Sequence, residues 1–128
     1  MNKRRVGAVQ EQMAAAFLTQ HGVRIVDRNF RNGRAGEIDL IGYDGEVLVF
    51  IEVKYRNSVR SGTPEEAVTK TKQLSICRTA RFYIANRHLS VEDPMRFDVV
   101  AIQPAMADDN GQERVAVRWI RNAFPYQA

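Results

Sequence analysis

The sequence predicts a single α/β domain in which a central mixed sheet is flanked by helices. Its 128 residues have the usual length of one domain, so we expect residues 1–128 to share one core. Two segments have helical periodicity and five have strand patterns, in the order helix, three strands, helix, two strands. A helix between two groups of strands implies a crossover connection and a sheet covered by helices.

The first half of the chain predicts one helix followed by three strands. Apolar residues recur every four positions in the helix, and Gly22 provides a stop after it. Asp44-Gly45 is a strong signal for a hairpin turn between the second and third strands. The expected elements are a helix at 5–21, a strand at 23–30, a basic loop at 31–36, and strands at 37–43 and 46–55.

The second half predicts another helix and two more strands. Thr63-Pro64-Glu65-Glu66 has the pattern of a capping box, and a helix from there to about Asn86 is expected, with an interruption near Thr69. Strands are expected at 96–103 and 114–120, joined by a loop at 104–112. Asp98 interrupts an apolar strand, where it either supports a functional site or, as we favour, binds a neighbouring arginine.

The hairpin at residues 37–55 separates apolar from charged side chains. A two-residue Asp44-Gly45 turn pairs Asp39 with Phe50 and Glu37 with Glu52, whereas a slip of two residues keeps the same faces and sets Asp39 opposite Glu52. One face is expected to be apolar and buried, and consists of Ile38, Leu40, Val47, Val49, Ile51 and Val53. The other face carries four charged residues at the open end of the hairpin, namely Glu37, Asp39, Glu52 and Lys54.

Carboxylates that converge on one patch need a cation or a proton, because like charges on neighbouring strands destabilise the pair. Oxygen ligands without nearby His or Cys favour Mg²⁺ or Mn²⁺. Lys54 could hold a water or stabilise an oxyanion beside such an ion. The alternative is a solvated hairpin end in which Lys54 merely pairs with an acid, and an Asp/Glu-x-Lys triplet alone is a weak signal.

The charge distribution favours a polyanionic partner. The net charge is +4, with 15 Arg and 4 Lys. Residues 1–34 carry a net +5 and residues 54–87 a net +6, whereas residues 35–53 hold five acids and no base. Arg binds phosphate bidentately, so we expect nucleic acid as the partner and Arg34, in the basic loop, among its contacts. The alternative is a solvated surface rich in arginine.

The sequence also predicts a cytoplasmic location. Cys77 is the only cysteine, which excludes a disulfide framework and a cysteine-rich zinc site. The basic start at residues 1–5 is followed by an apolar run that ends at Gln10, so export is not expected. No stretch approaches the roughly 18 apolar residues of a membrane helix.

Several motifs resemble known families. Asp39, followed on the next strand by Glu52-Val53-Lys54, resembles the Asp…(Asp/Glu)-x-Lys site of restriction-endonuclease-like nucleases. Motifs over most of the chain resemble more closely the YraN-like family of small bacterial proteins, which is presumed to be nuclease-like. These motifs are residues 36–41, 49–56 and 64–68, Lys72, residues 96–100 and residues 122–124. Archaeal Holliday-junction resolvases are similar in size and in the order of elements.

The resemblance implies a restriction-endonuclease-like fold and assigns roles to individual residues. Asp39 and Glu52 would hold a divalent metal, and Glu11, on the first helix, matches a glutamate that resolvases bring to the same ion. Lys54 would position the attacking water or stabilise the phosphate in the transition state. Arg56 and Lys72 would contact phosphates.

We therefore expect a Mg²⁺- or Mn²⁺-dependent endonuclease that cuts phosphodiester bonds in DNA, with selectivity for branched substrates as one option. The residues assigned to catalysis are Lys54, Glu52, Asp39 and Glu37. Cutting two strands with one site in so small a domain would need a homodimer. The alternatives are a module that binds nucleic acid or protein without cutting it, and a domain that uses the metal only for stability.

Overall fold

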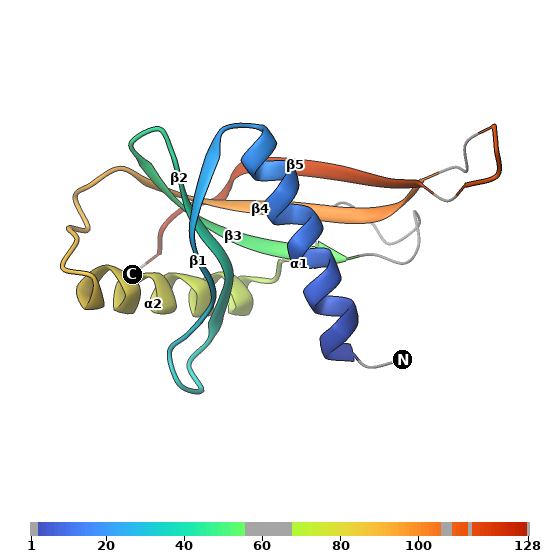
Figure 1. The fold of residues 1–128 in the computed structure, drawn as a ribbon. Coiled ribbons are helices and arrows are strands. Elements are labelled where there is room, and N and C mark those ends of the chain that lie inside the picture. Colours follow the sequence, from blue (N-terminus) through green and yellow to red (C-terminus); the bar gives the residue numbers. More distant parts are fainter. Residues whose placement is uncertain (1–2, 56–67, 106–108, 113, 128) are drawn as a thin grey trace.

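The computed structural model describes residues 3–55, 68–105, 109–112 and 114–127, and within them a five-stranded sheet carries one helix on each face (Figure 1). The strands lie in the order β1-β2-β3-β4-β5. The elements are α1 (Lys3–Gln20), β1 (Val23–Arg31), β2 (Glu37–Asp44), β3 (Val47–Tyr55), α2 (Lys70–Asn86), β4 (Met95–Ala105) and β5 (Arg114–Phe124).

The topology confirms the predicted mixed sheet and crossover connection. Neighbouring strands are antiparallel except β3 and β4, which pair in parallel from Leu48↔Met95 to Tyr55↔Ile102. Parallel neighbours need a long connection, and α2 lies within it. The central pair β3–β4 is therefore covered on both faces, as its apolar sequence predicts.

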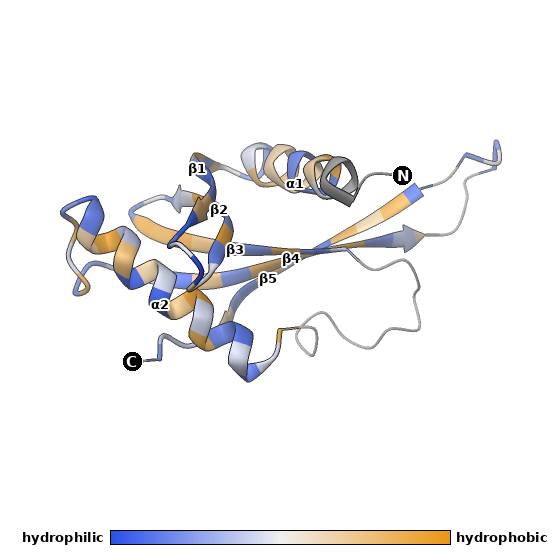
Figure 2. Ribbon diagram, turned by 90° about the horizontal axis from the view of Figure 1, so that it is seen from below, coloured by the Kyte–Doolittle hydropathy of each residue, from blue (hydrophilic) through white to orange (hydrophobic). Residues whose placement is uncertain are grey.

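Two clusters of buried side chains fill the two faces. The α1-side cluster joins Ala14, Ala15 and Leu18 of α1 to residues of β1 to β4. The α2-side cluster joins α2 to the opposite face of the sheet and includes the stacked rings of Phe50 and Phe97. Figure 2 shows α1 and α2 on opposite sides of the sheet. The central strands β3 and β4 thus alternate their side chains between two cores, which accounts for the period of two in their sequence.

The turn of the β2–β3 hairpin lies one position later in the chain than the predicted turn at Asp44-Gly45. Each residue of β2 therefore pairs with a β3 residue two positions later than predicted. The turn residues are Gly45 and Glu46, and the structure pairs Ile41 with Phe50. Gly45 has a φ of +62°, a left-handed conformation that glycine adopts without strain. The alternative register, with a slip of two residues, is the observed one.

Ile38 corrects the predicted apolar face. It packs in the α2-side cluster, whereas Leu40, two residues later, packs on the α1 side. The β1–β2 hairpin runs past α2 (Figure 1), and a Cβ on Gly36 would press against the Ser75 and Thr79 hydroxyls. This end of the hairpin lies on α2, so Ile38 is buried by the helix and not by simple alternation.

The ends of the later elements also refine the predictions. α2 begins after Thr69, whose side chain accepts a hydrogen bond from the Lys72 N–H at 3.2 Å, an N-cap at the expected interruption. The capping box at residues 63–66 lies outside the described residues. β5 continues four residues beyond its predicted end, to Phe124. Among the described residues, no helix is long and apolar enough to cross a membrane.

Candidate active site

Asp39 and Glu52 lie on adjacent strands at the end of the hairpin remote from its turn. Pairing of β2 with β3 runs from Asp44↔Val47 to Leu40↔Ile51. At the next position Asp39 Oδ2 accepts a hydrogen bond from the backbone N–H of Val53 at 2.8 Å. This contact fixes the Asp39 carboxylate against β3, and no residue pattern signalled it because its donor is a backbone group.

Glu52 is a buried carboxylate with two lysines on one side. Its side chain is 7% exposed, and Oε1 lies 3.7 Å from Nζ of Lys54 and 4.0 Å from Nζ of Lys72. Lys72 comes from the first turn of α2, so the helix completes a group begun on β3. The other oxygen, Oε2, is buried and has no hydrogen-bond partner among the described residues. A buried carboxylate oxygen without a partner is unusual and needs an explanation.

The environment of Asp39 disfavours its charged form. Burial, followed by the neighbouring carboxylate of Glu52, is the main cause that raises the pKa of Asp39 from the usual 3.8 to about 7. The hydrogen bond from Val53 acts in the opposite direction, and Glu11 and Glu37 add smaller rises. At neutral pH the Asp39 side chain therefore exchanges readily between its protonated and ionised forms.

Opposing effects also act on the pKa of Glu52. Burial raises the pKa of Glu52 above its usual 4.5, although the ammonium groups of Lys72 and Lys54 lower it. Two carboxylates that both resist ionisation favour any ligand that neutralises them together. A divalent cation has that property.

Glu11 and Glu37 border the carboxylate pair. They line a hollow of about 390 Å³ together with residues of α1 and β1. The carboxylate of Glu37 is paired with Arg31 at 3.3 Å, and Glu37 also raises the pKa of Glu52. Glu11 thus acts on Asp39 through its charge, as a minor contribution to the raised pKa of Asp39, and Glu37 is in an ion pair with β1.

The predicted phosphate contacts fall in different places. Lys72 joins the carboxylate group, as described above. Arg34 is exposed in the loop between β1 and β2, and the neighbouring Ala35 carbonyl accepts a hydrogen bond from Ser75 of α2 at 2.8 Å. Arg56 lies outside the described residues.

The donors fit an open magnesium site better than a closed metal cage. Among the described residues, no three His, Cys, Asp or Glu side chains form a ready-made metal-binding group, so the set of Asp39, Glu52 and Glu11 is not preformed. Mg²⁺ commonly uses one or two carboxylates and fills its other positions with water and substrate phosphate. Asp39 and the unpartnered Oε2 of Glu52 provide such donors.

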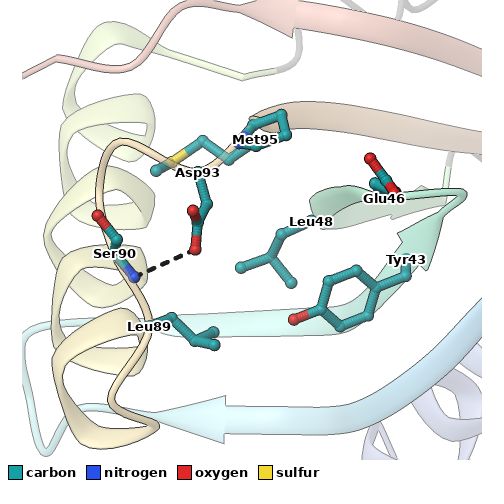
Figure 3. Close-up of a pocket in the computed structure, with 8 residues that line it drawn as sticks. Tyr43, Glu46, Leu48, Leu89, Ser90, Asp93 and Met95 are labelled. Atoms are coloured by element: carbon teal, nitrogen blue, oxygen red, sulfur yellow. Dashed lines mark hydrogen bonds between the residues drawn. The ribbon is translucent and has the colours of Figure 1, made fainter.

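A second hollow, of about 230 Å³, lies at the other end of β3 (Figure 3). Its walls include Tyr43 and Leu48 of the hairpin and Leu89 and Asp93 of the connection from α2 to β4. Six residues along a strand cover about 20 Å, which separates Leu48 from Lys54. The hollow is therefore distinct from the carboxylate pair.

Comparison with known proteins identifies close relatives. Residues 10–102 match the uncharacterised protein family UPF0102. A UPF0102 protein of Symbiobacterium thermophilum is 52% identical over 121 residues, which cover 94% of this chain and 97% of that protein. One from Lachnoclostridium phytofermentans is 41% identical over 124 residues, with 97% and 96% covered. One from Aliivibrio fischeri is 44% identical over 124 residues, with 96% and 94% covered.

Proposed function

The chain belongs to the uncharacterised protein family UPF0102, and we propose that it is a metal-dependent nuclease with a restriction-endonuclease-like fold. Membership confirms the resemblance to the YraN-like family. One observation carries the proposed activity: beside the half-buried Asp39, the buried Glu52 has a carboxylate oxygen without a partner among the described residues, next to Lys54 and Lys72. Structural carboxylates are normally fully hydrogen-bonded, so this pair is better suited to binding an ion.

The residues divide the work of phosphodiester hydrolysis. Asp39 and Glu52 hold Mg²⁺ or Mn²⁺, which when bound polarises a phosphate and lowers the pKa of a water. Lys54 lies on the same strand face as Glu52 and stabilises the negative charge that develops on the phosphate. Lys72, 39% exposed at the start of α2, attracts the phosphate from the other side of Glu52.

The proposed substrate is DNA, bound mainly through its backbone. Arginine-rich basic segments flank the acidic hairpin in the sequence and favour phosphate contacts without a requirement for base sequence. A homodimer would bring two sites together for cutting two strands, as a branched substrate requires. The same chemistry and the single buried cysteine are consistent with action in the cytoplasm.

The decisive experiment is strand cleavage by wild type, Lys54→Ala and the control Lys70→Ala. Lys70 is an exposed lysine on α2, so its loss removes the same charge outside the carboxylate group. Labelled single-stranded, duplex, flap and four-way-junction DNA, and RNA, are incubated with Mg²⁺, Mn²⁺ or EDTA. We expect metal-dependent cleavage that falls by about 10²–10³-fold in Lys54→Ala and persists in Lys70→Ala. Equal cleavage by Lys54→Ala and wild type would refute the assigned role.

A second candidate function is a binding module that retains the fold without cutting. The observation that favours it is the missing preformed group of three metal ligands within the described part of the chain. Salt-sensitive DNA binding by wild type, with no cleavage of any substrate in either metal, would establish this function in place of the first.

A further inference from the structure

We propose that the exposed side of α2, together with the adjoining tip of the β1–β2 hairpin, binds single-stranded DNA. Phe82 stacks on an unpaired base, and Arg34 and Arg78 contact phosphates. These three residues and Phe30 are called the α2 patch below. Its role rests on the proposed function, because it specifies the kind of strand that reaches the carboxylate pair.

The helix α2 carries basic side chains and no acidic ones. Its 17 residues contain no Asp or Glu and four bases, namely Lys70, Lys72, Arg78 and Arg81. Arg78 and Arg81 are exposed, as is Arg34 in the hairpin loop. In the described part of the chain, none of these three arginines takes part in an ion pair. Their guanidinium groups are therefore available to an anionic ligand such as a phosphate.

One stripe along α2 brings an arginine next to an exposed aromatic ring. Ser75, Arg78 and Phe82 follow one another at spacings of three and four residues, which place them on one face of the helix. The buried residues of α2 occupy other positions, and Phe82 is 44% exposed. An exposed ring beside a cation is a surface on which an unpaired base can stack.

The tip of the β1–β2 hairpin completes the patch. The hairpin runs past α2 (Figure 1), and Ser75 Oγ donates a hydrogen bond to the Ala35 carbonyl at 2.8 Å. This contact holds the backbone of Arg34 beside the stripe, about one helical turn from Arg78. Phe30 of β1 lies against Phe82, with ring centroids 6.0 Å apart. Each of the two segments therefore contributes one aromatic ring and one arginine.

The same helix connects the patch to the carboxylate pair. Lys72, whose Nζ lies 4.0 Å from Oε1 of Glu52, precedes Phe82 by ten residues, or about 15 Å along the helix axis. At 3.4 Å or so per nucleotide of a stacked strand, this distance corresponds to about four nucleotides. A strand that stacks on Phe82 therefore reaches the proposed site within a few nucleotides.

The chemistry of the patch favours a single strand over the other possible partners. In a symmetric dimer the patch would face its own copy, and arginines would oppose arginines with no acid of α2 to offset them. In duplex DNA the bases are already paired and stacked, so only their backbone could contact the patch. Phe82 could also serve merely to cover Phe30, since single exposed apolar residues are common.

The patch is tested with variants that keep the fold. Phe82→Leu retains an apolar side chain over Phe30 and removes the stacking ring. Arg34→Gln and Arg78→Gln each remove one charge from the patch. The matched control Arg121→Gln removes one from the opposite face of the sheet, where the exposed Arg121 packs over Trp119. Binding of fluorescein-labelled oligothymidylate and duplex DNA is measured in EDTA between about 50 and 200 mM salt, and cleavage is measured separately in Mg²⁺.

We expect Phe82→Leu to weaken binding of the single strand by about tenfold and to leave duplex binding unchanged. Arg34→Gln and Arg78→Gln should each reduce the slope of log K against log salt by about 0.7 on the single strand, whereas Arg121→Gln binds like wild type. Phe82→Trp provides a direct signal, because the only tryptophan of wild type is Trp119. Its added fluorescence should be quenched by the single strand and not by the duplex.

Single-strand binding that Phe82→Leu and both patch arginine variants leave unchanged would overturn the α2 patch, and metal-dependent cleavage would then still support the nuclease. Weaker binding by these variants, in a protein that cleaves no substrate, would support the patch and refute catalysis. Sedimentation velocity supplies a further check. A dimer that dissociates in Phe82→Leu, with DNA binding unchanged, would assign the patch to an interface between copies and overturn the proposal.

Discussion

Two buried carboxylates lie on neighbouring strands of the sheet and differ in their hydrogen-bond partners. Asp98 of β4 is fully buried and accepts hydrogen bonds from Arg96 Nε at 3.0 and 3.1 Å, Trp119 Nε1 at 2.9 Å and the Asn122 N–H at 2.9 Å. Glu52 of β3 has two distant lysines on one oxygen and no hydrogen-bond partner for the other among the described residues.

The difference separates a structural carboxylate from a functional one. Both oxygens of Asp98 are occupied by groups of β4 and β5, so this side chain ties the two strands together and confirms the expected contact with a neighbouring arginine. Glu52 contributes no comparable set of bonds, and its burial raises its pKa. A buried carboxylate without a full set of hydrogen bonds lowers the stability of the fold. Groups of this kind are typical of sites that bind a ligand.

The largest expected effect is on activity, at Glu52. Glu52→Gln keeps the shape and removes the charge, so we expect cleavage in Mg²⁺ to fall by about a thousandfold or more. Because the lost ion pairs are long and their lysines are partly exposed, the free energy of unfolding should change by less than about 1 kcal/mol. Cleavage assays and urea denaturation of the same preparation measure both. A large loss of stability in Glu52→Gln would remove the contrast with Asp98.

The next effect is on stability, at Asp98. Asp98→Ala removes a buried acceptor and leaves Trp119 and the Asn122 N–H without it, so the free energy of unfolding should fall by about 3 kcal/mol. Urea denaturation followed by circular dichroism measures the change. At a temperature where the variant is folded, metal-dependent cleavage should remain within a few-fold of wild type. Cleavage lost from a folded Asp98→Ala would place Asp98 in the functional site.

A smaller effect concerns pH in the metal-free protein. The pKa of Asp39 rises from 3.8 in the unfolded chain to about 7 in the fold, so folding takes up a proton within that interval. The free energy of unfolding should therefore decrease as pH rises from 4 to 7 or so, by about 3 kcal/mol relative to Asp39→Asn, which does not titrate. Denaturation of both proteins in EDTA across this range tests the sign. Parallel curves for the two proteins would contradict the raised pKa.

The smallest expected effect is the contribution of one hydrogen bond to Asp98, the one donated by Trp119, to the free energy of unfolding. Trp119→Phe removes the indole N–H that donates to Asp98 at 2.9 Å and keeps a ring beside Phe17. Loss of one hydrogen bond to a charged group should lower the free energy of unfolding by about 1.5 kcal/mol. Thermal unfolding measures it, with activity at low temperature as the control. No change in stability would show that the Arg96 and Asn122 contacts suffice.

The sequence predicted the elements and the grouping of the charged residues because both depend on short periods. Alternation along β3 places Glu52 and Lys54 on one face whatever the register, and the helix between β3 and β4 imposes the crossover. The exact pairing of β2 with β3 was not predictable in the same way, because a slip of two residues leaves every side chain on the same face of the sheet. The structure has the turn at Gly45 and Glu46, one position later than the sequence signal indicates.

Other features depend on contacts between distant segments. Asn122 has a φ of +53° and donates its N–H to Asp98, and β5 continues past its predicted end at Ile120. Ile38 changes sides because the hairpin end lies on α2. The partner of Asp39 is the backbone N–H of Val53, fourteen residues later in the chain. None of these relations has a local signature in the chain.

The most direct test of the central claim is Mn²⁺ binding, followed by electron paramagnetic resonance of the free ion. The proteins compared are wild type, Asp39→Asn, Glu52→Gln and the control Glu46→Gln, an exposed acid at the opposite end of the same hairpin. The account predicts that wild type and Glu46→Gln remove Mn²⁺ from solution equally and that the other two variants lose this binding. Binding that is unchanged in Asp39→Asn and Glu52→Gln, or absent from folded wild type, would contradict it.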